Sequence, residues 1–125
     1  MNITEHCKRE DFDCRDGTLY PAEWIESRLV PLCRDLETIR AETGGPLYVL
    51  SGYRTSVYNQ KVGGRPRSEH KEGLAGDLSS RKKTPKELYN IILRLIAEKK
   101  IKDGGLCVYH WGVHYDHGPI RRWEE

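Results

Sequence analysis

The sequence predicts an α+β fold in which a small antiparallel sheet packs against helices. Two segments place apolar residues at the spacing of one helix face, and several short apolar segments between glycines and prolines are typical of strands. The chain has 125 residues and no internal repeat. Because this length is usual for one domain, we expect a single domain over residues 1–125.

The first helical segment runs from Pro21 to Arg40, and Pro31 is expected to kink it or to begin its second part. Residues 44–46, Gly-Gly-Pro, should end it, and residues 47–50 then predict a short buried strand. The apolar stripe of this helix is Ile25, Leu29, Leu32, Leu36 and Ile39.

The second helix has a clear start, because Thr84 can cap it, Pro85 suits its first position and Glu87 completes a capping box. Before it, we expect a short helical turn over residues 57–62 and a strand over residues 74–78. After it, residues 106–109 and 113–116 predict a hairpin. The buried stripe of this helix is Leu88, Ile91, Ile92, Leu95 and Ile96.

Composition and charge exclude several classes of protein. The formal net charge of +2 is too close to balance to indicate a nucleic-acid partner, and no apolar segment is long enough for a membrane span. The first ten residues lack the apolar core of a signal peptide, so we expect synthesis to end in the cytoplasm. A monomer without a membrane partner is expected.

The four cysteines form no Cys-x-x-Cys pair, which argues against a zinc ribbon. In a chain without a leader, reduced and partly buried thiols are the default expectation. A disulfide between Cys7 and Cys14, or a metal role for them, is the alternative.

A candidate metal site comes from His70, Asp77, His114 and Asp116. Each residue alone is weak evidence for a metal site. Together they supply the nitrogen and oxygen ligands that zinc accepts, with a fourth position left for water. The small residues between His70 and Asp77 allow the backbone to bend so that the two side chains converge. His114 and Asp116 share a face if their segment is a strand.

These residues match a known family. Ser68-x-His70-x-x-Gly73-x-Ala75-x-Asp77, with Ser51-Gly52-Tyr53-Arg54 before it and Val113-His114-x-Asp116 after it, resembles the zinc D-alanyl-D-alanine carboxypeptidases. That superfamily includes VanY-type and VanX-type peptidases, phage L-alanyl-D-glutamate endolysins and the hedgehog signalling domain. The resemblance implies a hedgehog/DD-peptidase-like fold, and one Zn²⁺ held by His70, Asp77 and His114 beside an activated water.

Three residues are candidates for contact with the substrate, and the resemblance itself implies only the first of them. Arg54 is expected to stabilise the developing oxyanion or to bind a substrate carboxylate, because its donors form a fixed fork. A surface ion pair is the alternative for Arg54. Tyr53 could form part of a peptide groove, although core packing explains it equally well. Ser68 could line the pocket, but capping of the turn is favoured.

At the position of the general base, this chain departs from the better-known relatives. Those relatives place an acid or a histidine two or three residues before the last histidine ligand, where this chain has Gly112 and Trp111. Asp116 is our first candidate for the general base, because it is the carboxylate closest to His114 on the same face of the strand. His110 is the second candidate, if the turn of the hairpin brings it back toward the ligands. The alternative is that Asp116 only orients a ligand by a hydrogen bond.

The predicted function is that of a zinc metallopeptidase that hydrolyses peptide bonds in the stem peptides of bacterial peptidoglycan, as a D,D-carboxypeptidase or an endopeptidase. A wall hydrolase without a leader suits a phage endolysin that is released through a membrane pore. The alternative is a zinc-stabilised binding module for cell-wall peptides or for a protein partner.

Overall fold

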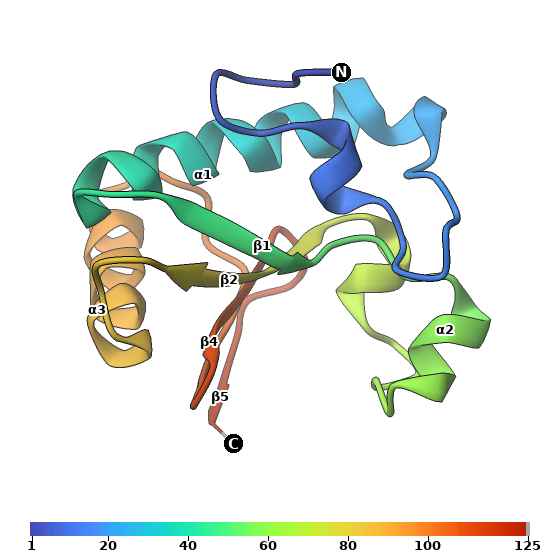
Figure 1. The fold of residues 1–125 in the computed structure, drawn as a ribbon. Helices are drawn as coiled ribbons and strands as arrows, with labels where there is room; N and C mark the ends of the chain where they lie inside the picture. The colour runs from blue at the N-terminus through green and yellow to red at the C-terminus, as the bar shows by residue number, and fades with distance from the viewer. Residues whose placement is uncertain (125) are drawn as a thin grey trace.

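The computed structural model describes residues 1–124 and has the expected α+β architecture (Figure 1). The helices are α1 (Val30–Thr43), α2 (Ser56–Lys61) and α3 (Pro85–Ala97). The strands are β1 (Leu47–Ser51), β2 (Ala75–Ser80), β3 (Gly105–Tyr109), β4 (Gly112–Asp116) and β5 (Arg121–Glu124). Short 3₁₀ turns span Arg9–Phe12, Ala22–Trp24 and Glu69–Glu72, and a π-helical turn spans Ile25–Leu29.

The five strands form one sheet in the order β1-β2-β4-β3-β5. The β3–β4 hairpin is confirmed, and β1, β2, β4 and β3 pair antiparallel. One strand pair differs from the predicted antiparallel sheet, because β5 pairs with β3 in parallel, with Gly105 opposite Arg121. Residues 121–124 are Arg-Arg-Trp-Glu, which is neither an apolar run nor an alternating pattern, so this edge strand has no local sequence signal.

The start of α3 is as predicted, but the first helical segment is not one helix from Pro21 to Arg40. A 3₁₀ turn and a π-helical turn come first, and α1 then runs from Val30 to Thr43. Pro31 lies in the first turn of α1, directly after the π-helical turn, so it begins the second part of the helical segment. Gly44 ends α1 with a φ of 72°, a conformation that glycine adopts without strain. In α3, Thr84 and Glu87 form the complete capping box.

The expectation that residues 47–50 form a buried strand is wrong in part. Strand β1 lies at an edge of the sheet, and its side chains alternate between half-buried and exposed. Tyr48 and Leu50 are exposed, while Leu47 and Val49 pack against the core. An apolar run of this length fits either a central or an edge strand, and only the neighbouring strands decide between the two.

The hydrophobic core lies on one face of the sheet. Leu78 of β2 and Val113 and Tyr115 of β4 pack there with the apolar sides of α1 and α3. Because side chains alternate along a strand, Asp77 and His114 point to the opposite face. The four cysteines are buried, and within the described residues none of them forms a disulfide. No helix within residues 1–124 is both long and apolar enough to cross a membrane.

Candidate metal centre

Two of the three candidate ligands lie opposite each other on neighbouring strands. Asp77 of β2 pairs directly with His114 of β4 in the antiparallel register. Directly opposed residues share a face and have neighbouring Cβ atoms, so the register alone brings the carboxylate and the imidazole together. Both side chains are buried.

His70 reaches the same place from the 3₁₀ turn Glu69–Glu72. Ser68 caps this turn, since its Oγ accepts a hydrogen bond from His70 N at 3.2 Å. Gly73 ends the turn with a φ of 67°, and a Cβ there would overlap Tyr20 and Trp24. The chain can therefore turn back into β2 within seven residues, which explains the glycine in this part of the motif.

The three side chains converge on one point. His70 Nε2 lies 3.1 Å and His114 Nδ1 lies 3.0 Å from Asp77 Oδ1. One potential ligand atom from each residue lies within 4.8 Å of the other two. Two ligands about 2.0–2.2 Å from a tetrahedral zinc would lie about 3.3 Å apart, so these distances fit one ion.

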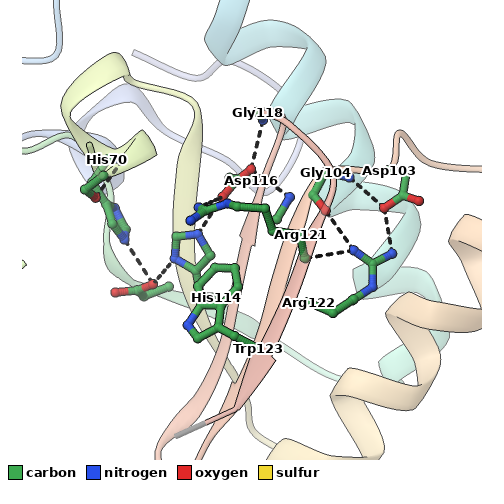
Figure 2. A network of polar contacts seen from close by, with 12 residues as sticks. His70, Asp103, Gly104, His114, Asp116, Gly118, Arg121, Arg122 and Trp123 are labelled. Carbon is green, nitrogen blue, oxygen red and sulfur yellow. Dashed lines mark hydrogen bonds and ion pairs between the residues drawn. The ribbon is translucent and has the colours of Figure 1, made fainter. Parts of the chain in front are cut away.

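The other nitrogen of each imidazole fixes its tautomer. His70 Nδ1 lies 2.6 Å from the carbonyl oxygen of Gly52, which can only accept, so this nitrogen donates its proton there. His114 Nε2 lies 2.7 Å from Asp116 Oδ2 and donates to it in the tautomer that leaves Nδ1 free to bind a metal (Figure 2). In the neutral rings, lone pairs of both remaining nitrogens then face the Asp77 carboxylate. Three electron-rich atoms can be this close only with a proton or a cation between them, which supports a metal site.

Asp116 lies behind His114 and not in front of the ligands. Its side chain is fully buried, and its Oδ1 accepts hydrogen bonds from the N–H groups of Gly105 and Gly118, each at 2.8 Å. A Cβ at Gly105 would overlap this carboxylate. The arrangement matches the alternative in which Asp116 orients a ligand, and it does not favour Asp116 as general base.

The two histidines differ in their affinity for protons. Burial lowers the pKa of His70, which keeps this ring neutral. Burial also acts to lower the pKa of His114, but hydrogen bonds to Asp116 and Asp77 outweigh it and raise the pKa. Burial acts to raise the pKa of Asp77, and the hydrogen bonds from His114 and His70 reverse this, so the carboxylate stays charged.

These shifts predict that metal binding weakens as the pH falls. A ligating histidine must be neutral, so below the raised pKa of His114 a metal ion has to displace one proton. The affinity for Zn²⁺ should then fall about tenfold for each pH unit. Competition with a chromophoric chelator, corrected for the chelator's own protonation, measures this slope, and a pH-independent affinity across the range would contradict the assignment.

Arg54 supports the second oxygen of Asp77. Its guanidinium donates from Nη2 to Asp77 Oδ2 at 3.2 Å, from Nε to Ser51 Oγ at 3.2 Å and from Nη1 to Asn59 Oδ1 at 3.3 Å. Its side chain is only 15% exposed. This is a partly buried ion pair with a candidate ligand, while the predicted contact of Arg54 with substrate stays a prediction.

A pocket of about 310 Å³ opens over the candidate ligands. Ser68 lines it as well as capping the turn, and Tyr109 and Trp111 form a stacked pair at its wall, with ring centroids 4.6 Å apart. The pocket is open to solvent.

Two predicted site residues do not line this pocket. Tyr53 packs edge-on against Tyr20 and Trp24, with ring centroids 6.1 Å and 5.9 Å away, so the core-packing alternative is the one that the structure supports. His110 is exposed at the turn between β3 and β4 and does not curl back. The placement of these two residues adds no support for their predicted roles, which stay predictions.

Sequence reasoning missed Glu69. This residue lines the pocket. Within residues 1–124, two carboxylates line it, and the other one is the candidate ligand Asp77. Burial raises its pKa, and the nearby charge of Asp116 adds to this. The only sequence signal for Glu69 was its position next to His70 in the motif. This signal was not specific, because any polar residue is suitable at that position of a 3₁₀ turn.

Fold and site together define a class: a small α+β domain that holds a buried His-Asp-His set at the base of an open pocket. The sequence matches the family Peptidase M15 over residues 3–116, and the chain belongs to this family. No curated protein matches the chain significantly. The family match confirms the predicted resemblance and indicates a metal-dependent peptidase.

Proposed function

We propose that this protein is a zinc-dependent peptidase that hydrolyses peptide bonds in the stem peptides of peptidoglycan. The observation that supports the zinc centre most strongly is the convergence of two imidazole nitrogens and one carboxylate oxygen at the base of an open pocket. Nitrogen and oxygen donors of this kind suit zinc, and three protein ligands leave a position for water.

The chain's own residues would arrange the reaction. A bound zinc ion would supply a water of lowered pKa, near about 7, and would polarise the scissile carbonyl. Asp116 and the Gly52 carbonyl hold the two imidazoles in their ligating tautomers, and Arg54 holds the Asp77 carboxylate. Tyr109 and Trp111 give the pocket an apolar wall for the peptide.

The proton of the attacking water needs an acceptor in the pocket, and Glu69 is placed better than Asp116 for this role. Asp116 has both oxygens engaged behind His114, whereas Glu69 lines the pocket itself. The leaving amine also needs a proton, and a carboxyl that has accepted one can return it.

The test is digestion of purified peptidoglycan by zinc-loaded protein, with the released fragments identified by mass spectrometry. We expect release of D-alanine or of cleaved stem peptides by the wild type, and none above background by His70→Ala. The masses identify the bond that is cut. If wild type with one bound zinc releases nothing from walls of several chemical types, the binding-module alternative is favoured and the peptidase proposal fails.

A further inference from the structure

The pocket over the candidate ligands is strongly cationic. It is lined by four arginines and two carboxylates, namely Arg54, Arg65, Arg67, Arg121, Asp77 and Glu69. The lining therefore has a formal charge of +2, equal to that of the whole chain, and a bound divalent cation would increase it. Positive charge gathered in one pocket concentrates anions there.

The arginine nearest the metal site is largely engaged. Each of the three nitrogens of Arg54 donates to a side chain of the protein, as described above. A guanidinium has five N–H donors in a fixed fork, so little of this fork remains for an incoming carboxylate. An anionic group of the substrate must find its partners elsewhere in the pocket.

Arg65 and Arg67 are available. Both are exposed in the loop that leads to Ser68, and within residues 1–124 neither forms an ion pair. The loop itself is fixed, because the carbonyl oxygen of Arg65 accepts hydrogen bonds from Asn59 Nδ2 at 2.8 Å and from Ser68 N at 3.0 Å. A fixed backbone lowers the entropy cost of holding a bound group.

Strand β5 supplies the facing cation. The guanidinium of Arg121 lies 4.6 Å and that of Arg65 lies 5.6 Å from the centre of the Trp123 ring. Arg121 also lies 3.6 Å from Asp116 Oδ2, and its side chain is 38% exposed. Trp123 packs beside His114, with Arg121 close by (Figure 2). Because Arg65 contacts the same Trp123 ring, both cations lie near the candidate metal site.

We propose that Arg65, Arg67 and Arg121 make the pocket selective for acidic peptides, by binding a substrate carboxylate between the 63–68 loop and β5. This inference rests on the proposed peptidase function and specifies its substrate class. Stem peptides suit it when the α-carboxyl group of their isoglutamyl residue is free, and not when this group is amidated. Carboxylate–guanidinium hydrogen bonds are strong and directional, so they can discriminate between the two.

The test compares two synthetic pentapeptides, L-Ala-γ-D-Glu-L-Lys-D-Ala-D-Ala and the same peptide with the isoglutamyl α-carboxyl amidated. Zinc-loaded protein is assayed for cleavage by mass spectrometry and for binding by calorimetry. We expect kcat/KM for the free acid to be about 10- to 100-fold higher, from the size of charged hydrogen bonds. The difference should lie in KM, since a carboxylate that does not react is bound equally in the ground state and in the transition state.

The variant R65Q/R67Q should abolish this preference while its zinc content stays at the wild-type level. Arg81→Gln is the matched control, because it removes a charge from an exposed arginine outside the pocket. The control should keep the preference. Raising the ionic strength should weaken it in the wild type, because exposed charges are screened.

The outcomes separate the two proposals. Equal cleavage of both peptides would overturn the selectivity and leave the peptidase function standing. Binding that depends on the carboxylate, without cleavage, would support the selectivity and overturn the peptidase function. If inorganic phosphate competes as well as the free-acid peptide, the pocket accepts any anion, and selectivity for peptide carboxylates is overturned.

Discussion

The variant His70→Ala is expected to lose its bound zinc and, with it, all measurable peptidase activity. His70 offers one of three candidate ligand atoms, and two remaining ligands hold a metal ion weakly. Removal of a group that only supports a ligand lowers metal affinity by about 10- to 100-fold, and loss of a ligand itself should lower it further. Metal content by mass spectrometry of protein purified without a metal-binding tag measures this directly.

The control for this prediction is His6→Ala. His6 is a half-exposed histidine of the N-terminal segment, where its ring contacts Glu37 away from the pocket. This variant should keep about one zinc per chain. Circular dichroism of both variants shows whether they fold. A folded His70→Ala protein that retains its zinc would remove His70 from the ligand set.

Asp116→Asn and Glu69→Gln are expected to damage different steps. In Asp116→Asn, the remaining oxygen can still accept from Gly105 and Gly118, so the new NH₂ group faces His114 Nε2. It would then favour the tautomer with the proton on Nδ1, where the metal should bind. We expect zinc affinity to fall about 10- to 100-fold and excess zinc to restore kcat.

Glu69→Gln should leave zinc affinity near the wild-type value and lower kcat by about 10²- to 10⁴-fold, the usual range for loss of an acid–base group. Titration of each variant with zinc, followed by kcat at saturation, separates the two roles. If saturating zinc fails to restore Asp116→Asn while Glu69→Gln keeps full kcat, Asp116 is the proton acceptor after all.

Much of the fold could be predicted because its signals are local. The capping box of α3, the glycine that ends α1 and the β3–β4 hairpin depend on residues close together in the chain. Strand β5 could not be predicted, because its residues have no strand-like pattern and are ordered by pairing with β3. Burial of β1 likewise depends on its place at the edge of the sheet.

The candidate ligands were predictable for a related reason. The motif around His70 and Asp77 encodes a tight return of the chain, with Ser68 as its cap and Gly73 as its end. The residues around the ligands were not predictable in the same way. Tyr53 precedes Arg54 in the sequence, yet their side chains point to different surroundings, one into an aromatic cluster and the other to Asp77.

The sequence by itself thus determined the elements, the family resemblance and the three side chains that could bind a metal, since backbone preferences and donor chemistry are properties of the residues. Only the tertiary structure decided that Nδ1 of His114 meets Asp77 and that Nε2 meets Asp116. It also brought the arginines of a loop and of β5 to one pocket. These relations depend on strand register and on contacts between segments distant in the chain, which local patterns do not encode.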